Sequence, residues 1–195
     1  MKLLLNLANL MILLVMFSCS DSITETAINF DQETPIRIDQ KLFEVEYINY
    51  AWGYSHMGIH IDDTGKLYSY RYEHNIKYED QWKSNQEGVY SEQKLHEKFE
   101  HDKQLVNTIN EAELIQMISL ISGAIEGNLS KPESKMTDFG IWRYKSYSYD
   151  NIAREYTEII LKEDGDWFGE NESWQAKAIA AWLEAQKENW LESVK

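Results

Sequence analysis

The chain has 195 residues and carries 19 Lys and Arg against 33 Asp and Glu, a formal net charge of −14 at pH 7. This acidic balance excludes nucleic acid as the main partner, because such affinity depends on Lys and Arg that neutralise phosphates. The single cysteine excludes an internal disulfide and a Cys-rich zinc or iron–sulfur site. With 43% hydrophobic and 13% aromatic residues, the composition is that of a folded domain and not of a disordered polyelectrolyte.

The first 18 residues have the features of a secretory signal peptide. Lys2 gives a short basic start, and the apolar run from Leu3 to Phe17 that follows has only two asparagines as polar members. Ser18 supplies the small residue that precedes a cleavage site. The run is too short and too interrupted for a membrane-spanning helix, which needs about 20 apolar residues.

The only cysteine follows this segment directly, within Met16-Phe17-Ser18-Cys19. These residues resemble the lipobox of bacterial lipoproteins, although Met16 stands where a leucine is usual. In that family the peptide is cut before the cysteine, which then carries lipid on its sulfur and on its new amino terminus. The resemblance implies a firm anchor at Cys19, since each buried methylene of an acyl chain such as palmitate contributes about 0.8 kcal/mol. The alternative is an ordinary signal peptide with an incidental cysteine.

Two further resemblances suggest a location. Ser20 follows the cysteine, and by resemblance to lipoprotein sorting in Gram-negative bacteria a residue other than Asp there implies the outer membrane, facing the periplasm or the exterior. The late pattern of a Tyr-rich hairpin, then Gly165-Asp166-Trp167, then a Trp-bearing helix resembles small lipoproteins of Bacteroidota. Cleavage after residue 18 would remove one lysine and no acid, so the acidic charge belongs to the exported part.

The mature chain is predicted to consist of a tether and one domain. Residues 19–35 comprise the lipidated cysteine and a polar, mixed stretch that ends at Pro35, and they are interpreted as a flexible tether. The alternative for this stretch is a short extra strand at the edge of the domain. Residues 36–195 are predicted to form a single globular domain, in which no period of 20–50 residues recurs strictly.

The first part of the domain has the alternation of antiparallel strands. A first strand alternates apolar and acidic side chains, the period of a half-buried strand, in Phe43, Glu44, Val45, Glu46 and Tyr47. A turn at 49–54 precedes a second strand. The sequence Asp63-Thr64-Gly65 is a turn signal before a return strand at 66–73.

If Gly65 adopts the positive φ of a bulged turn, the register of this hairpin is fixed. The predicted cross-strand pairs are Ile61 with Leu67, His60 with Tyr68, Gly58 with Tyr70 and His56 with Tyr72. One face then carries the apolar side chains Met57, Ile59, Ile61 and Leu67. The opposite face carries His56, His60, Tyr68, Tyr70 and Tyr72.

Two helices are predicted in the middle of the chain. Ser91 can cap the first, which places Leu95, Phe99 and Val106 on one side. Asn110 has capping-box spacing at the start of the second, together with Glu113. The apolar residues of the second helix repeat at helical intervals before Gly123 and Gly127 mark its end, and they are Leu114, Met117, Ile118, Ile121 and Ile125.

The C-terminal part returns to strands and ends in a helix. Strands are predicted at 139–149 and 153–162, with a turn at 163–169. Asn171 or Ser173 caps the last helix, whose predicted apolar stripe is Trp174, Ala178, Ala181, Trp182 and Ala185. The order βββ-αα-ββ-α predicts an α+β domain, an antiparallel sheet of Tyr-rich hairpins covered by three helices.

The hairpin face with two histidines and three tyrosines is the candidate ligand-binding site. Aromatic rings stack on sugars and pack against peptides, so Tyr68, Tyr70 and Tyr72 would form a platform for a protein or a glycan, beside His56 and His60. The alternative is that the tyrosines lie under the helices as core.

A metal site on the same hairpin would use His56, His60 and Asp62. It would need a bend at Gly58 that brings both rings to one ion, because a ligand atom must lie about 2 Å from its metal. Cross-strand pairing of His with Tyr is the simpler interpretation, so neither a metal nor a cofactor is predicted.

Catalytic motifs are missing, which limits what the sequence says about activity. The chain has no G-x-S-x-G elbow, P-loop, Gly-rich dinucleotide fingerprint or H-E-x-x-H. The sequence therefore predicts a non-catalytic binding or accessory module of the cell envelope, with a preference for basic partners. Two alternatives stay open: an exported hydrolase or metal-dependent enzyme that uses His56, His60 and nearby acids, and an immunity or inhibitor lipoprotein.

Overall fold

The computed structural model describes residues 40–49, 54–72, 88–100, 102–131, 133–135 and 140–194. The predictions for the signal peptide, for the tether at 19–35 and for most of the turn at 49–54 lie outside these residues. Among the helices that are described, none has the length and apolarity that crossing a membrane requires.

The described part of the chain forms nine strands and three helices, which confirms the α+β class and roughly the predicted order. In chain order the elements are β1 Lys41–Asn49, β2 Ser55–Asp62, β3 Lys66–Tyr72, β4 Val89–Ser91, α3 Glu92–Glu100, β5 Gln104–Thr108, α4 Glu111–Ile125, β6 Glu133–Ser134, β7 Ile141–Asp150, β8 Glu155–Gly165, β9 Trp167–Glu170 and α5 Trp174–Ser193.

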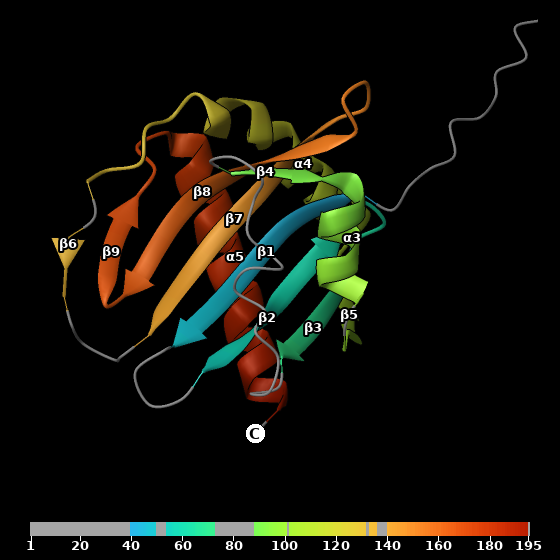
Figure 1. Cartoon of the computed structure of the whole chain (residues 1–195), viewed down its shortest axis with the longest axis horizontal. Helices are drawn as coiled ribbons and strands as arrows, with labels where there is room; N and C mark the ends of the chain where they lie inside the picture. Colours follow the sequence, from blue (N-terminus) through green and yellow to red (C-terminus); the bar gives the residue numbers. More distant parts are fainter. Residues whose placement is uncertain are drawn as a thin grey trace, which may run out of the picture. The chain divides into compact units, whose positions relative to one another are not determined.

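The strands form one antiparallel sheet with the order β5-β3-β2-β1-β7-β8-β9-β6 (Figure 1). Strand β4 pairs with the beginning of β8, while β9 pairs with its end, so both share one edge of β8. The three longest strands, β1, β7 and β8, lie in the middle of the sheet and have a partner on each side.

The hairpin of β2 and β3 has the predicted register. The pairs Ile61 with Leu67, His60 with Tyr68, Gly58 with Tyr70 and His56 with Tyr72 are all present. Gly65 has a φ of 78°, the left-handed value that a bulged turn requires. Asp62 closes the turn, because its Oδ1 accepts from the backbone N–H of Thr64 at 2.9 Å and of Lys66 at 3.0 Å.

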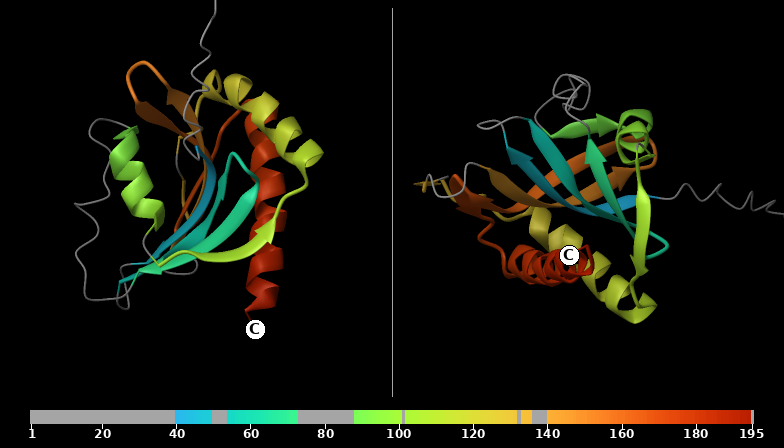
Figure 2. Two further views of the ribbon diagram at one scale, coloured as in Figure 1. Left: turned by 90° about the vertical axis from the view of Figure 1, so that its right-hand side faces the viewer. Right: turned by 90° about the horizontal axis from the view of Figure 1, so that it is seen from below.

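Helices cover the sheet on both faces: α4 and α5 lie on one side and α3 lies on the other (Figure 2). The core on the α4–α5 side consists of Leu42, Phe43, Val45, Ile59, Ile61, Leu67, Ile109, Leu114, Met117, Ile121, Ala124, Tyr144, Ile159, Leu161, Ala176, Ile179, Ala180, Leu183 and Trp190. The core on the α3 side is smaller and mostly aromatic, with Tyr70, Tyr72, Tyr90, Leu95, Phe99, Tyr147 and Tyr156.

The helix that Ser91 caps is shorter than the sequence predicts. Ser91 Oγ accepts from the backbone N–H of Lys94 at 3.3 Å, which confirms the cap. The helix ends at Glu100, and Val106 lies in β5, so the prediction that Val106 belongs to the helix is wrong. Asp102 has a φ of 51°, and a residue in the left-handed conformation cannot continue a right-handed helix.

The helix α4 begins as predicted but does not end at its first glycine. Asn110 accepts hydrogen bonds from backbone N–H groups of the first turn, which confirms the cap. Gly123 lies inside the helix, at a point where α5 approaches closely. A Cβ at this position would lie 2.2 Å from Gln175 Nε2. Two residues of the predicted apolar face, Ile118 and Ile125, are exposed and not buried.

The prediction for α5 is wrong about which side of the helix is buried. Ser173 caps the helix by accepting from the backbone N–H of Ala176 at 3.1 Å. The buried residues are Ala176, Ile179, Ala180, Leu183, Lys187 and Trp190. Of the predicted stripe, Trp174, Ala181 and Ala185 are exposed, so that side of the helix faces away from the sheet. Trp182 donates from its indole to Glu113 on α4.

The segment predicted as a turn at 163–169 is largely strand. Strand β8 continues to Gly165 and β9 begins at Trp167, so the reversal is confined to the residues around Asp166. Gly165 has a φ of 132°, and a Cβ there would lie 2.1 Å from the carbonyl oxygen of Gly140. A glycine at 165 therefore permits this close reversal.

Candidate functional site

The predicted ligand-binding face of the β2–β3 hairpin lies under α3. His56, His60, Tyr70 and Tyr72 are all buried, and Tyr68 is half-buried. The prediction of an accessible platform is therefore wrong for the four buried residues. The alternative, that the tyrosines are core, is confirmed for Tyr70 and Tyr72.

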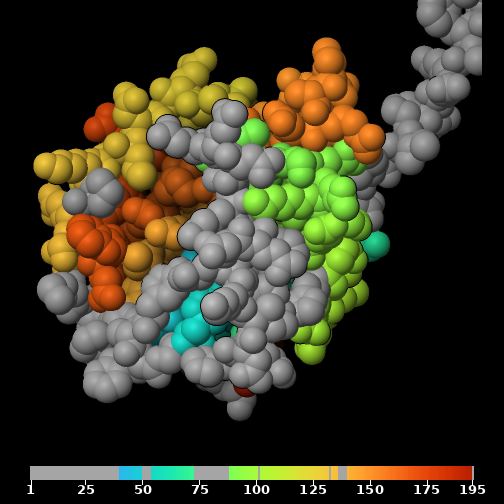
Figure 3. Space-filling view, viewed as in Figure 1, coloured from blue at the N-terminus to red at the C-terminus, as the bar shows by residue number. Residues whose placement is uncertain are grey.

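The helix α3 covers part of this face with its own apolar side, and its residues are visible at the molecular surface in Figure 3. Leu95 and Phe99 are fully buried beneath it. The ring centroid of Phe99 lies 4.4 Å from that of His60. The hydroxyl of Tyr72 donates to the backbone carbonyl of Lys98 at 2.7 Å, so the polar end of this buried ring has a partner on the helix.

The same face buries four charged side chains that the sequence analysis did not single out as a site. Glu44 and Glu46 on β1, Lys98 on α3 and Lys145 on β7 are each no more than 4% exposed. Buried charges are costly unless they are paired and hydrogen bonded. The buried ion network is our name for these four residues and their partners, which are His56, Tyr70, Tyr147 and Glu158.

Glu44 lies at the centre of the buried ion network. Its Oε1 accepts from the Tyr70 hydroxyl at 2.6 Å and lies 2.7 Å from Lys98 Nζ. Its Oε2 accepts from the Tyr147 hydroxyl at 2.5 Å and lies 3.5 Å from Lys145 Nζ. Both carboxylate oxygens are thus occupied by donors from β3, β7 and α3.

Glu46 links the network to His56. Its Oε1 lies 2.7 Å from His56 Nε2 and 3.2 Å from Lys98 Nζ, and its Oε2 accepts from Lys145 Nζ at 2.6 Å. The other ring nitrogen of His56, Nδ1, lies 2.8 Å from the Tyr54 hydroxyl. His56 therefore has a partner at both nitrogens, whichever tautomer it adopts.

Gly58 makes room for the network in the middle of β2. It pairs with Tyr70 across the hairpin, and a Cβ at this position would lie 2.7 Å from the Tyr70 hydroxyl oxygen. The same Cβ would lie 2.1 Å from the backbone carbonyl oxygen of Val45. Without a side chain at 58, the Tyr70 ring can lie across β2 and reach Glu44 on β1.

The charges of the network set the protonation states of its members. Burial alone would raise the pKa of Glu44 and of Glu46, but the ammonium groups of Lys98 and Lys145 hold both pKa values below the usual 4.5. Burial would lower the pKa of Lys145, but Glu158, Glu46 and Glu44 together hold it well above 10.5. At neutral pH the two carboxylates are therefore ionised and Lys145 is protonated.

This arrangement suits holding the fold together better than it suits proton transfer or nucleophilic attack. Burial, followed by the negative charge of Glu44, raises the pKa of Tyr70 and of Tyr147 well above 10, so both phenols remain protonated donors. A protonated Lys145 has no lone pair with which to attack a substrate. The network instead connects β1, β2, β3, β7 and β8 of the sheet to α3.

His60 is buried beside the network and takes no part in it. Its side chain is fully buried, and neither ring nitrogen has a hydrogen-bond partner among the residues that are described. The ring stacks on Tyr68 with 5.2 Å between the centroids. Burial first, and then the charges of Lys41, Lys103 and Lys98, lower the pKa of His60 well below 6.5, so its imidazole is neutral.

The residues of the hypothetical metal site have separate roles in the structure. Both ring nitrogens of His56 are occupied, His60 lies against Phe99, and Asp62 closes the β2–β3 turn. Within the described ranges, no three His, Cys, Asp or Glu side chains are grouped so that they could hold an ion. The hydrolase alternative, which relied on His56 and His60, gains no support from these contacts.

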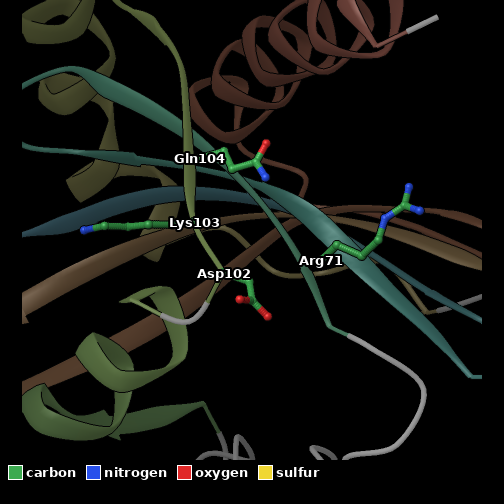
Figure 4. A pocket seen from close by; sticks show the side chains of 4 residues that line it. All are labelled: Arg71, Asp102, Lys103 and Gln104. Carbon is green, nitrogen blue, oxygen red and sulfur yellow. The ribbon is translucent and has the colours of Figure 1, made fainter.

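A surface depression of about 410 Å³ lies at the edge of the sheet where β5 begins (Figure 4). It is lined by Arg71, Asp102, Lys103 and Gln104, and Figure 4 shows their side chains pointing in different directions. Lys103 donates to Glu100 at 2.6 Å and lies over the ring of Tyr68. The described residues of its lining therefore lack the convergent polar groups that a small-molecule site uses.

The fold and the buried ion network together define the class of this protein, an α+β domain whose antiparallel sheet has an aliphatic face and a charged face. Comparison of the chain with family models, with curated proteins and with solved structures gave no match. Its function is therefore inferred from its own residues.

Proposed function

We propose that this chain is an outer-membrane lipoprotein, anchored through Cys19, that acts as a non-catalytic binding module of the cell envelope. The observation that carries the anchor is the sequence Met16-Phe17-Ser18-Cys19 directly after an apolar run. In this proposal residues 1–18 are the signal peptide and residues 19–35 are the lipidated cysteine and its tether. Residues 36–195 are the binding domain, which faces the periplasm or the exterior.

The occupied groups of the buried ion network support the non-catalytic role. Glu44 and Glu46 receive hydrogen bonds and ion pairs on both oxygens, and a substrate would have to displace a buried lysine or tyrosine to reach them. A catalytic base has to be within hydrogen-bond reach of the proton that it removes. The network is a poor candidate for that task because its acceptors already serve the fold.

The charge of the chain supports a basic partner. A formal charge of −14 attracts positively charged surfaces and repels nucleic acid and anionic lipid. Of the two partner classes expected from the sequence, a protein with a basic surface therefore fits better than a neutral glycan. Because Tyr70 and Tyr72 are buried, the docking surface has to lie elsewhere on the domain.

The substitution Cys19→Ser tests the anchor. Cells of a Gram-negative host that express the wild type in labelled palmitate should incorporate the label into this chain, and the protein should stay with the membranes after a high-salt wash. Cys19→Ser should lose the label, whereas the matched neighbour Ser20→Ala should keep it. Label on Cys19→Ser, or none on the wild type, would overturn the proposal.

The substitution Ser20→Asp tests the choice of membrane. By resemblance to lipoprotein sorting in Gram-negative bacteria, the wild type should band with the outer membrane in a density gradient and Ser20→Asp should band with the inner membrane. Ser20→Ala serves again as the control that should not move. A wild type found in the inner-membrane band would contradict the outer-membrane location while leaving the lipid anchor intact.

A further inference from the structure

The helix α4 carries a row of exposed apolar side chains that belongs to neither hydrophobic core of the described residues. Ile115, Ile118 and Ile125 are 57%, 37% and 48% exposed. They are three and seven residues apart, so they project from one side of the helix. The isoleucine stripe is our name for these three residues.

The stripe is distinct from the two sides of α4 that the fold uses. One side is buried against the sheet through Leu114, Met117, Ile121 and Ala124. A second side meets α5, where Gly123 lies against Gln175 and Glu113 accepts from Trp182. At about 3.6 residues per turn, the stripe projects away from α5, on the flank beyond the buried side.

Acidic side chains stand at both ends of the stripe. Residues 111–130 contain Glu111, Glu113 and Glu126 and neither Lys nor Arg. Glu111 and Glu126 are exposed, and neither forms an ion pair with any residue in the described ranges. At about 1.5 Å of rise per residue they lie about 22 Å apart along the helix. Two exposed negative charges therefore frame an exposed apolar row.

We infer that the isoleucine stripe is the docking site for an amphipathic helix of a partner protein, whose apolar side covers the stripe and whose basic side chains pair with Glu111 and Glu126. This inference rests on the proposed role as a binding module and names its surface and its partner class. Recognition of this kind uses apolar anchors at helical spacing on one partner and a complementary apolar surface on the other. The partner's lysines or arginines supply the charge complementarity.

The same charges argue against two other occupants of the stripe. Antiparallel pairing of two copies through this surface would place Glu111 of one copy beside Glu126 of the other, and parallel pairing would place each acid beside its own equivalent. Both arrangements bring like charges together, which destabilises a helix pair. An anionic lipid surface meets the same repulsion, since membrane surfaces attract basic and not acidic helices.

The test uses two designed helical peptides of about 20 residues as probes. The first has leucines at i, i+3, i+4 and i+7 with lysines on both flanks, and the second has glutamates in place of those lysines. Each labelled peptide is titrated with the full lipidated chain in discs of zwitterionic lipid, with empty discs in parallel. The lysine peptide should bind with micromolar affinity, and the glutamate peptide should bind about tenfold more weakly or not at all.

Variants of the chain locate the binding. The double variant Ile115→Ser with Ile118→Ser should weaken binding of the lysine peptide about tenfold. The matched control is Ile152→Ser, since Ile152 is 92% exposed outside the stripe, and it should change nothing. Glu111→Gln with Glu126→Gln should weaken binding less and reduce its salt dependence. Because all these side chains are exposed, the urea midpoints should stay at the wild-type value.

Four outcomes would overturn the inference. Equal binding of the two peptides would show that the acidic side chains do not contribute to binding. An equal loss of binding in Ile152→Ser would show that the isoleucine stripe is not the binding site. Binding to empty discs at the same affinity would assign the peptide to lipid. Dimers in sedimentation that the stripe variant abolishes would assign the surface to a second copy. Loss of palmitate labelling, by contrast, would overturn the anchor and leave peptide binding unchanged, so the two proposals fail separately.

Discussion

The two faces of the sheet are buried by different physical means. On the α4–α5 face the core is mostly apolar, and its stability comes mainly from removing apolar surface from water. On the α3 face, buried carboxylates and ammonium groups are held by tyrosines and by one another. Strand β1 supplies both faces, since Phe43 and Val45 point to the first and Glu44 and Glu46 to the second.

Equal burial on the two faces does not mean equal tolerance to substitution. An aliphatic contact is non-directional, so losing part of a side chain costs roughly the area and the cavity that it leaves. A buried ion network is directional, and removing one member leaves its partners charged, buried and unpaired. The α3 face should therefore respond to single substitutions and to pH in ways that the α4–α5 face does not.

The largest effect is expected from Lys145→Met. This change keeps most of the side-chain volume but leaves Glu46 and Glu158 without the ammonium group that lies 2.6 Å and 3.0 Å from them. Breaking a buried pair by removing one partner costs about 3–5 kcal/mol, and urea unfolding at pH 7 should show a loss of free energy of unfolding in that range. A loss similar to that of a surface substitution would show that water reaches the network.

The matched control for this prediction is Arg154→Met, which also removes a cation from an ion pair. Arg154 Nε lies 2.7 Å from Glu92 Oε2, a distance like those inside the network, but the arginine is exposed. Surface pairs contribute little because water and salt screen both charges. The midpoint of urea unfolding of Arg154→Met should therefore stay near that of the wild type.

On the aliphatic face, Leu161→Ala should cost about 3 kcal/mol at pH 7, since Leu161 is fully buried in the α4–α5 core. The losses of unfolding free energy in Leu161→Ala and Lys145→Met should differ in their dependence on pH. The Leu161→Ala loss should be the same at pH 7 and pH 4, because it involves no titrating group. The Lys145→Met loss should shrink at pH 4, because the carboxylates that it leaves unpaired can take up protons. Parallel shrinkage of both losses would contradict the division between the faces.

The register of the β2–β3 hairpin, and the side chains that it turns toward the α4–α5 side, could be predicted from the sequence because both depend on local signals. The alternation of Met57, Ile59 and Ile61 and the turn glycine at Gly65 specify which side chains share a face. The stripe of α5 could not be predicted from its apolar residues, since Lys187 sits within the buried side. Its Nζ donates to the Tyr144 hydroxyl at 2.9 Å, a contact that no helical period reveals.

The network was missed because its burial depends on an element far along the chain. Glu44 and Glu46 alternate with apolar residues, and that pattern is typical of a strand with one solvated face. Both carboxylates pair with Lys98 of α3, which lies more than 50 residues later in the chain. One signal was available: Gly58 in the middle of a strand opposite Tyr70 marks a close approach of the kind that the network uses.

Lowering the pH should destabilise the α3 face, and not the α4–α5 face, without any substitution. Burial acts to raise the pKa of Glu44 and of Glu46, but Lys98 and Lys145 outweigh it and hold both below 4.5. The network therefore contributes stability that is fully present above pH 4.5 and is lost as pH falls through the folded-state pKa values. Each unit of depression is worth about 1.4 kcal/mol. Urea unfolding between pH 6 and pH 3 should show this decline, and a flat profile below pH 4.5 would contradict the pairing.

The smallest effect is expected at His60, the one buried titratable group on the α3 face without a hydrogen-bond partner in the described part of the chain. The positive charges of Lys41 on β1, Lys103 before β5 and Lys98 on α3 act on its imidazole. Burial and these charges lower its folded-state pKa well below 6.5. The unfolded chain therefore takes up a proton below pH 6.5 that the folded chain does not, and stability should fall with pH from that point.

The substitution His60→Phe should remove this decline. Between pH 6.5 and pH 5 the wild type should lose up to about 1.4 kcal/mol of unfolding free energy per pH unit, and His60→Phe should lose almost none. At pH 7 the variant should match the wild type or exceed it by about 1 kcal/mol, since a phenyl ring leaves no buried nitrogen unpaired beside Phe99. The exposed His96 supplies the control, because His96→Gln should keep the wild-type slope. If His60→Phe keeps the pH dependence of the wild type, another group causes it. Burial of a neutral His60 would then cost no stability in this pH range.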